Sequence, residues 1–373
     1  MTRVCFEVSS PVAWSPRVAQ VRGIFDVPEN DRSHRAWSID MPLAERPWNV
    51  GLIVGPSGSG KSTLARRLWP AELERAPFAW RHDRALVDDF PEALTVQAMV
   101  ELLSSVGFSS PPSWEKPFHV LSNGEQFRVG IARLLAESPE LAVVDEFTSV
   151  VDRTVAQIGS HAIQKTVRRR AQRFVAVTCH EDVEEWLQPD WVCRPAEELF
   201  IWRSVQPRPR VELEIARVHS SAWELFKHHH YLTAELSRSA WCFVAFWRER
   251  PVAFTSWLPF VGKLRDERAG RREHRTVCLP DYQGIGIGNA IATHLAACWR
   301  ALGMRAFVSS GHPAIARARA QGGAWRLTRK SSTTSRDNDR EKAKRRSWNR
   351  LTCSLEYVGE PAPLQAALRL LSS

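Results

Sequence analysis

A glycine-rich loop between an apolar run and a helical run constrains this chain more than any other feature. Residues 49–54, NVGLIV, lead into GPSGSGKST, after which LARRLW is typical of a helix. Glycines let backbone N–H groups wrap phosphates, and the start of a helix adds partial positive charge. A lysine here reaches the outer phosphates, and the serine after it can ligate Mg²⁺. We therefore predict an ATP·Mg²⁺ site formed by Gly55, Ser57, Gly58, Ser59, Gly60, Lys61, Ser62 and Thr63.

Two carboxylates follow a second apolar run. Residues 141–144 are LAVV, and Asp145 and Glu146 come directly after them. A carboxylate in the first position can hold Mg²⁺ together with Ser62, and one in the second can polarise the attacking water. The pair predicts hydrolysis of the bound ATP.

Three further motifs stand in the order of a known superfamily. LSNGEQFRV at 121–129 resembles the LSGGQ signature of the ABC ATPases, and Asp152 stands where their D-loop aspartate belongs. His180, which closes FVAVTCH, resembles their switch histidine. The resemblance covers about residues 20–203 and implies an ATPase in which Glu146 and His180 are catalytic.

The signature also implies a partner. ABC signatures act in trans, so the resemblance implies a head-to-tail homodimer. In that dimer Ser122 and Gly124 of one subunit would cap ATP bound by the other.

This chain departs from the transporter members of that superfamily in two ways. Only about sixty residues separate Lys61 from Ser122, which indicates an abbreviated helical subdomain. After an expected strand at 85–87, Asp88 and Asp89 occupy the place of the glutamine that couples transporters to membrane helices. No apolar run approaches the roughly 20 residues of a membrane span, and the N-terminus does not resemble a secretion signal. We expect a cytoplasmic, non-transport protein without a membrane partner.

Two prolines within residues 204–210 divide the sequence. Before them, strand-like and helix-like runs alternate, which is typical of a parallel α/β sheet. We therefore predict an ABC-type P-loop NTPase domain of fold class α/β at 1–205. At 206–373 we predict a smaller, mixed α+β domain.

A second glycine-rich loop lies in this smaller domain, between a strand at 275–279 and a helix at 289–302. Gln283, Gly286 and Gly288 resemble motif A of the GNAT acyltransferases, and the likeness covers roughly 211–330. It implies that acyl-CoA, such as acetyl-CoA, binds with its pyrophosphate on main-chain amides and its thioester beside the strand. The residues concerned are Leu279, Gln283, Gly284, Ile285, Gly286, Ile287, Gly288 and Asn289.

The catalytic groups of this domain are less well defined. Acyl transfer to an amine needs a base for the nucleophile and an acid for the leaving thiolate. Many GNATs use a tyrosine as that acid, and residues 313–321 contain none. We predict Tyr231 and His230 as the catalytic pair and keep Glu273, His274 and His312 as candidates. Residues 229–231, 311–313 and 323–325 also resemble the phage Mom group, which modifies DNA adenines.

The charge of the chain is concentrated in the same half. The net charge is +10, and residues 263–350 alone hold 20 Lys and Arg against 7 Asp and Glu, a net of +13. A basic field of this size attracts nucleic acid, and Trp325 and Trp348 are the expected stacking residues, although a solvated face is an equal alternative.

These observations support one leading hypothesis, an ATP-dependent acyltransferase that acts on an amine of DNA or tRNA. A nucleic-acid factor with a non-catalytic acyl-CoA sensor and an acetyltransferase acting on a protein or small-molecule amine remain open alternatives. A transport ATPase subunit is the least favoured.

Overall fold

A computed structural model describes most of the chain, namely residues 3–27, 32–204, 211–230, 235–260, 269–329 and 352–372. The chain forms two compact units. Unit 1 comprises Met1–Phe78, Ser138–Val150 and Val167–Gln206, and unit 2 comprises Ala79–Glu137, Val151–Thr166 and Pro207–Ser373. The predicted domain bounds, 1–205 and 206–373, stay a prediction.

Unit 1 is built on a five-stranded sheet in the order β4-β5-β3-β6-β7. The strands β4 to β6 are parallel, and β7 is antiparallel to β6. All of β3 is buried, as expected for a parallel strand covered on both faces. The bounds are β3 Val50–Val54, β4 Leu141–Val144, β5 Arg173–Thr178, β6 Trp191–Arg194 and β7 Leu199–Trp202, with helices α2 Lys61–Leu68, α3 Pro70–Leu73 and α8 Val183–Leu187. Helix α7, Arg153–Arg169, belongs to unit 2 as far as Thr166.

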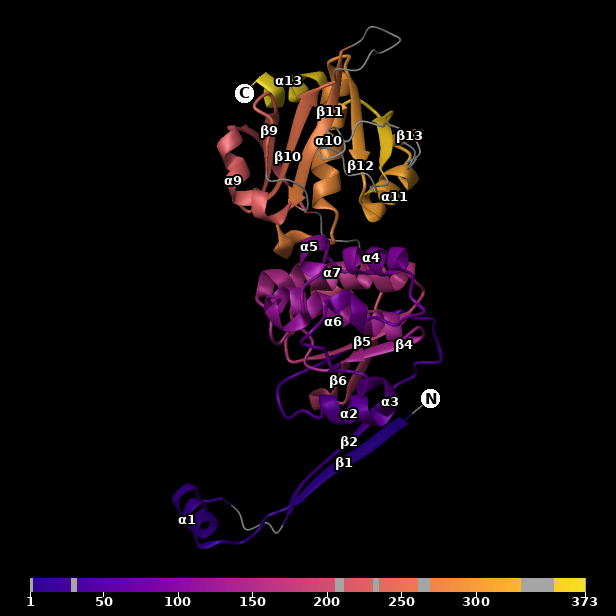
Figure 1. Cartoon of the computed structure of the whole chain (residues 1–373). Helices are drawn as coiled ribbons and strands as arrows, with labels where there is room; N and C mark the ends of the chain where they lie inside the picture. The colour runs from indigo at the N-terminus through magenta and orange to yellow at the C-terminus, as the bar shows by residue number, and fades with distance from the viewer. Residues whose placement is uncertain are drawn as a thin grey trace. The chain divides into compact units, whose positions relative to one another are not determined.

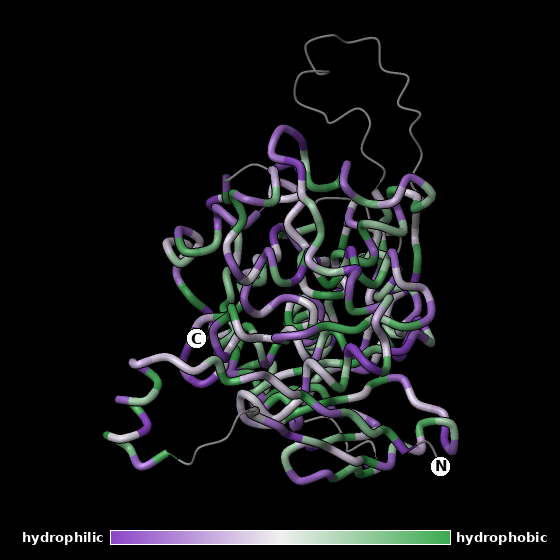
Figure 2. The backbone as a smooth tube through the Cα atoms, turned by 90° about the horizontal axis from the view of Figure 1, so that it is seen from below, coloured by the Kyte–Doolittle hydropathy of each residue, from purple (hydrophilic) through white to green (hydrophobic). Residues whose placement is uncertain are grey.

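The N-terminal residues form a separate two-stranded ribbon and not part of that sheet. Strand β1 (Arg3–Pro11) pairs antiparallel with β2 (Arg32–Asp40), and helix α1 (Pro16–Phe25) lies between them in sequence. None of the residues of α1 is buried, and hydrophobic and hydrophilic residues alternate along it (Figure 2).

The first helical segment of unit 2 lies where a strand was expected. Residues 85–87 do not form the expected strand, because Leu86–Asp89 is a 3-10 helix, η1. The buried carboxylate of Asp89 accepts a hydrogen bond from the backbone N–H of Arg81 at 3.1 Å and pairs with its guanidinium at 3.2 Å, which fixes this turn. Next come α4 Val96–Ser105, α5 Pro111–Trp114, η2 Phe118–Val120 and α6 Asn123–Glu137.

Unit 2 also contains a seven-stranded mixed sheet in the order β13-β14-β12-β11-β10-β9-β8. Only β11 and β12 are paired in parallel among its strands, and helix α10 packs against β10, β11 and β12 (Figure 1). The strands are β8 Glu214–Val218, β9 Trp241–Trp247, β10 Arg250–Pro259, β11 Gly270–Cys278, β12 Arg305–Ser310, β13 Trp325–Arg329 and β14 Cys353–Tyr357. The longer helices are α10 Ile287–Ala301, α11 Pro313–Gln321 and α13 Leu364–Ser372.

The predicted fold class is confirmed. A mainly parallel five-stranded α/β sheet with a glycine-rich loop is followed by a seven-stranded mixed sheet with a second such loop. None of the helices in the described part of the chain is both long and apolar enough to cross a membrane.

Gly51 allows the closest packing within the first sheet, and it gives a test of the fold. A Cβ atom added there would overlap the fully buried indole ring of Trp191. Overpacking of a dense core costs about 1–3 kcal/mol, so we expect Gly51→Ala to lower the free energy of unfolding by that amount in urea titrations. Gly130→Ala is the control, because a Cβ at Gly130 in α6 would have no heavy atom within 4 Å. Equal stability of the two variants would contradict this account of the core.

Candidate functional site

Strand β5 lies between the two strands that precede the predicted ATP-site residues of unit 1. It lies between β3 and β4, and the registers place Val54 beside Thr178 and Val144 beside Ala176. All three strands run in parallel, so their carboxyl ends lie at one edge of the sheet. The segments that follow them begin with Gly55, Asp145 and Cys179. Ligands bind at this edge in open α/β sheets.

The first glycine-rich loop has the geometry of an anion cradle. Gly58 and Gly60 have φ values of 74° and 90°, a left-handed region that favours glycine. Gly60 caps α2 without a side-chain hydrogen bond, so the first N–H groups of the helix are available to a ligand. The buried Oγ of Ser59 has no hydrogen-bond partner among the residues described, and Lys61 Nζ donates to the carbonyl of Pro56 at 2.8 Å. These groups fit a polyphosphate, and Ser62 lies in the same first turn of α2.

The two carboxylates after β4 differ in exposure. Asp145 is half-buried and accepts a hydrogen bond from the backbone N–H of Glu146 at 2.9 Å. Glu146 is exposed and has a φ of 52°, a strained conformation for a residue other than glycine. Ser149 holds this turn, because its Oγ donates to the carbonyl of Glu146 at 2.7 Å. The geometry leaves Asp145 in position for a cation and Glu146 open to water.

The loops after β4 and β5 are tied together by a buried hydroxyl. Thr178 Oγ1 donates to the carbonyl of Phe147 at 2.8 Å and accepts from the backbone N–H of His180 at 3.2 Å. Thr178 therefore links the segment that begins with the carboxylates to the half-buried histidine.

The N-terminal ribbon brings two residues to the first glycine-rich loop that no sequence motif indicated. Arg35 on β2 donates from Nη1 to the carbonyl of Gly58 at 3.1 Å. Trp37 lies against Gly60, since a Cβ there would be 2.9 Å from its indole. Phe6 of β1 stacks on Trp37 with the ring centroids 4.8 Å apart. A cation and an aromatic face therefore border the phosphate loop, and no local motif could have revealed them because they reach it through tertiary contact.

The predicted signature residues lie in unit 2, where they begin α6. Ser122 and Glu125 form a capping box: the carboxylate of Glu125 accepts from the backbone N–H of Ser122 at 3.0 Å and from its hydroxyl at 3.1 Å. A Cβ at Gly124 would lie 3.3 Å from Val155 of α7. The box fixes the start of the helix and leaves Ser122 exposed.

The second glycine-rich loop repeats the geometry of the first. Gly284 and Gly286 have φ values of 95° and 97°, and Gly286 caps the 15-residue helix α10 without a side-chain hydrogen bond. Gln283 Nε2 donates to the carbonyl of Cys278 at 3.0 Å, which ties the loop to the end of β11. Leu279 N donates to the carbonyl of Val252 at 2.9 Å. The predicted residues from Leu279 to Asn289 are thus one strand end, one loop and one helix start, and they fit a second anion.

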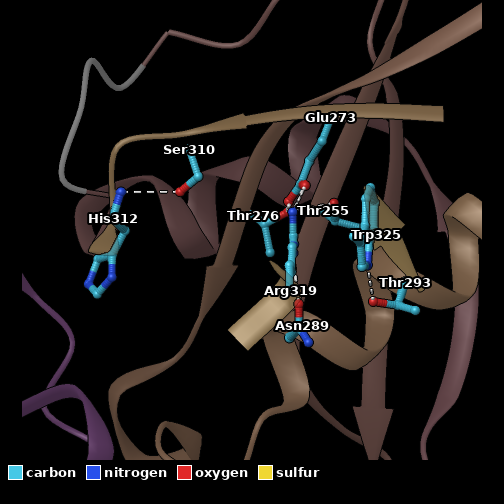
Figure 3. A network of polar contacts seen from close by, with 9 residues as sticks. All are labelled: Thr255, Glu273, Thr276, Asn289, Thr293, Ser310, His312, Arg319 and Trp325. Atoms are coloured by element: carbon cyan, nitrogen blue, oxygen red, sulfur yellow. Dashed lines mark hydrogen bonds and ion pairs between the residues drawn. The ribbon is translucent and has the colours of Figure 1, made fainter. Parts of the chain in front are cut away.

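A buried ion pair lies beside this loop (Figure 3). Arg319 of α11 donates to Glu273 of β11 at 2.5 Å and to the side-chain oxygen of Asn289 at 2.7 Å. Glu273 also accepts from Thr276, and the guanidinium of Arg319 lies 5.0 Å from the ring centroid of Trp325. The exposed fractions of the Arg319 and Glu273 side chains are 2% and 8%. The network joins β11, α10 and α11, and it gives Glu273 a structural contact that a free catalytic base would not have.

The other catalytic candidates lie on different elements: His230 follows the 3-10 helix Lys227–His229, His274 lies on β11 and His312 precedes α11. His230 is half-buried against Trp223, with the ring centroids 5.6 Å apart, whereas Tyr231 lies outside the described residues. Burial and then Arg275 lower the pKa of His274 to about 4, so its ring is neutral near pH 7. Burial also lowers the pKa of His312. The proposed pair of Tyr231 and His230 stays a prediction.

The expectation that Trp325 stacks on nucleic acid is wrong. Its side chain is 5% exposed, and Nε1 donates to Thr293 at 3.2 Å. The guanidinium of Arg319 also lies against the ring, so Trp325 is packed inside the fold. Trp348 and 8 of the 20 Lys and Arg residues of the region 263–350 lie in 330–351, outside the described residues.

Together, the parallel sheet, the phosphate cradle and the two carboxylates define a P-loop nucleotide-binding fold. Over 133 residues the chain is 31% identical to the zinc import ATP-binding protein ZnuC of Pseudomonas aeruginosa, a match to 30% of this chain and 49% of that relative. The methionine import ATP-binding protein MetN of Cutibacterium acnes is 30% identical over 182 residues, 38% of this chain and 49% of that relative. Part of this chain is therefore homologous to ABC ATPases, and the match spans about half the length of these curated relatives. No protein-family model matches the chain.

Two solved structures show a distant similarity to this chain. A bacterial ABC transporter cassette, solved as a dimer, is 16% identical with a TM-score of 0.34, covering 43% of this chain and 85% of that one. An IAA acetyltransferase from Bacillus cereus is 16% identical with a TM-score of 0.29, covering 39% of this chain and 99% of that one.

The buried ion pair provides a prediction about stability. Arg319→Leu would leave the Glu273 carboxylate buried without its cation, and loss of one partner of a buried pair costs about 3–5 kcal/mol. We expect a loss of that size in urea unfolding, with partial recovery in the double variant Glu273→Leu, Arg319→Leu. The control is Arg326→Ala, because Arg326 is 64% exposed and its partner Glu356 keeps the ion pair with Arg305 at 2.6 Å, so the loss should cost about 1 kcal/mol or less. Similar losses for Arg319→Leu and the control would exclude the role assigned to this pair.

Proposed function

We propose that this chain is a cytoplasmic ABC-type ATPase joined to a GNAT-like acyltransferase. It would use acyl-CoA to modify an amine on nucleic acid. The proposal rests mainly on one repeated observation: two helices, α2 and α10, each begin after a left-handed glycine and lack a side-chain cap. Such a helix start binds phosphate through its free N–H groups and its dipole.

The first of these helices would bind the phosphates of ATP. Lys61 would contact the outer phosphates, and Ser62 and Asp145 would hold Mg²⁺. The bound cation supplies charge neutralisation at the phosphates. Glu146 would orient the attacking water, and His180 would sense the terminal phosphate. Ser122 and Gly124 of a second copy would close the site, so the active form would be a homodimer.

The second helix would bind the pyrophosphate of acyl-CoA. The thioester would then lie near the end of β11, where Cys278 is the nearest thiol in sequence. Burial raises the pKa of Cys278 to about 12, and its Sγ donates to the carbonyl of Tyr282 at 3.3 Å. The reactive form of cysteine is the thiolate, so we propose direct transfer to the amine without an acyl-cysteine intermediate.

Nucleic acid is the proposed acceptor because of the charge of the chain. The net charge is +10, and the region 263–350 supplies a net of +13. Basic surfaces of this kind attract polyanions over long range and lose affinity as salt rises. A relation to the phage Mom group, and with it an adenine acceptor, stays a prediction.

A second candidate function is that of an ATP-driven nucleic-acid factor whose GNAT-like part senses acyl-CoA without catalysis. Three observations favour it. Helix α11 contains no tyrosine, Glu273 is held by Arg319, and the pKa of His274 is too low for an efficient base near pH 7. Binding of acyl-CoA without transfer would identify this function.

The ATP site is tested by two substitutions. Lys61→Ala removes the cation for the outer phosphates, and we expect loss of Mg·ATP binding in titrations with a fluorescent analogue. Glu146→Gln should retain binding, accumulate a dimer in light-scattering measurements and lower phosphate release about 10²–10⁴-fold, since it removes the group that activates water. Glu185→Gln on α8 is the exposed control. Parental hydrolysis in both test variants would refute the assignment.

The acyl-CoA site is tested with radiolabelled acetyl-CoA, incubated with DNA, tRNA and protein, with and without ATP. We expect label on nucleic acid, whereas label on protein alone would identify a protein acetyltransferase. Gly286→Ala should weaken CoA binding, because it places a side chain on the left-handed residue that exposes the amides of α10. Gly303→Ala is a matched control, since Gly303 is also left-handed (φ 76°) and follows the other end of the same helix. Equal CoA affinity in the two variants would count against the loop as the binding site.

A further inference from the structure

The second glycine-rich loop is held by the helix that begins with the signature sequence. Arg128 lies in the second turn of α6, and its Nη2 donates to the carbonyl of Asp281 at 3.0 Å. Arg128 is 1% exposed, whereas Asp281 is exposed, so the contact lies at the edge of the buried region. A residue of the signature helix therefore fixes the backbone at the start of the loop that we assign to acyl-CoA.

Two more contacts attach the same loop to neighbouring helical segments. The backbone N–H of Ser109 donates to Gln283 Oε1 at 2.8 Å. A Cβ added at Gly107 would lie 2.6 Å from the carbonyl oxygen of Gln283, and one at Gly284 would lie 2.9 Å from Ala162 of α7. At Gln283 and Gly284 the loop is therefore in direct contact with the segment after α4 and with α7.

The charges around Arg128 come from three functional segments. Its pKa is lowered by burial, and this effect is opposed by the carboxylates of Asp281, Glu125 and Asp152. Asp281 belongs to the second loop, Glu125 to the signature capping box and Asp152 to the predicted D-loop. An arginine remains protonated in proteins, so one buried cation faces carboxylates from all three segments.

A simple structural role accounts poorly for this arrangement. Among the described residues, Arg128 Nε has no hydrogen-bond partner, and Nη2 donates to a neutral carbonyl, that of Asp281. A buried cation in this state costs free energy that an apolar residue of similar size would not. By contrast, Arg319 has a carboxylate in direct contact. Arg128 is well placed to respond when one of the three segments moves.

We propose that Arg128 is a positioning residue that couples the signature helix to the acyl-CoA loop, so that Mg·ATP and acyl-CoA change each other's affinity. The inference rests on the proposed function, because it takes both ligands as given. ATP bound by one copy contacts Ser122 of the other copy and so acts on helix α6 of that second copy. Arg128 on the same helix then transmits the movement to Asp281 and to the amides after it. Coupling between two binding sites is reciprocal, so both affinities change by the same factor.

The test measures the affinity of CoA with and without saturating Mg·ATP, and the affinity of ATP with and without saturating CoA. The background is Glu146→Gln, so that ATP persists. Allosteric coupling commonly amounts to about 5–150-fold, and we expect at least about 5-fold in this background, equal in both directions. Addition of Arg128→Met should reduce the factor to less than about 2-fold.

A second variant guards against misfolding of Arg128→Met. Asp281→Asn keeps the shape of an exposed side chain and removes one of the charges that face Arg128, so it should give an intermediate factor. Arg317→Ala is the control: Arg317 joins α11 to Glu101 of α4 at the surface, and its loss should leave the factor unchanged.

The outcomes separate the coupling from the proposed function. If CoA and ATP both bind but neither alters the other, the coupling is refuted and the proposed function stands. If the coupling persists undiminished in both Arg128→Met and Asp281→Asn, the role of Arg128 is refuted. If CoA does not bind at all, the proposed function of the second loop fails, and the coupling fails with it.

Discussion

The N–H groups in the first turn of a helix must find partners, and this requirement bears on both of the ligand sites that we propose. Neither α2 nor α10 has a side chain to cap it, and each follows a glycine in the left-handed region. A residue with a Cβ would be strained there and would crowd an incoming anion. Each loop follows the end of a strand, β3 or β11, so the two sheets fix the positions of these helix starts.

How well the sequence predicted the sites depends on the range of the interactions involved. The phosphate loop and the carboxylates after β4 were predictable, since strand, loop and helix are adjacent in the chain. The strand expected at 85–87 was wrong because the ion pair between Asp89 and Arg81 favours a turn that propensity does not encode. The burial of Trp325 was not predicted because its partners, Arg319 of α11 and Thr293 of α10, contact it only in the folded protein. Arg35 was not predicted for the same reason, because it reaches the first glycine-rich loop only through a tertiary contact.

Two buried arginines beside the second loop illustrate different uses of an expensive group. Arg319 is compensated by Glu273 and joins three elements, so its contribution is to stability. Arg128 donates to a backbone carbonyl and faces carboxylates of three segments at longer range. A cation without a close counter-ion depends strongly on the geometry around it, because Coulomb energies change steeply with distance where water is excluded. The second arrangement is therefore the one sensitive to movement.

The chemistry proposed for the second unit also bears on what ATP would do. An acyl-CoA thioester is already activated, so its transfer to an amine requires no phosphate from ATP. ATP hydrolysis would then act on conformation, by selecting the state in which acceptor and thioester meet. Such a role requires a contact between the nucleotide machinery and the acyl-CoA loop. Signature helix α6 and that loop lie in the same compact unit and touch through Arg128, so the structure provides one.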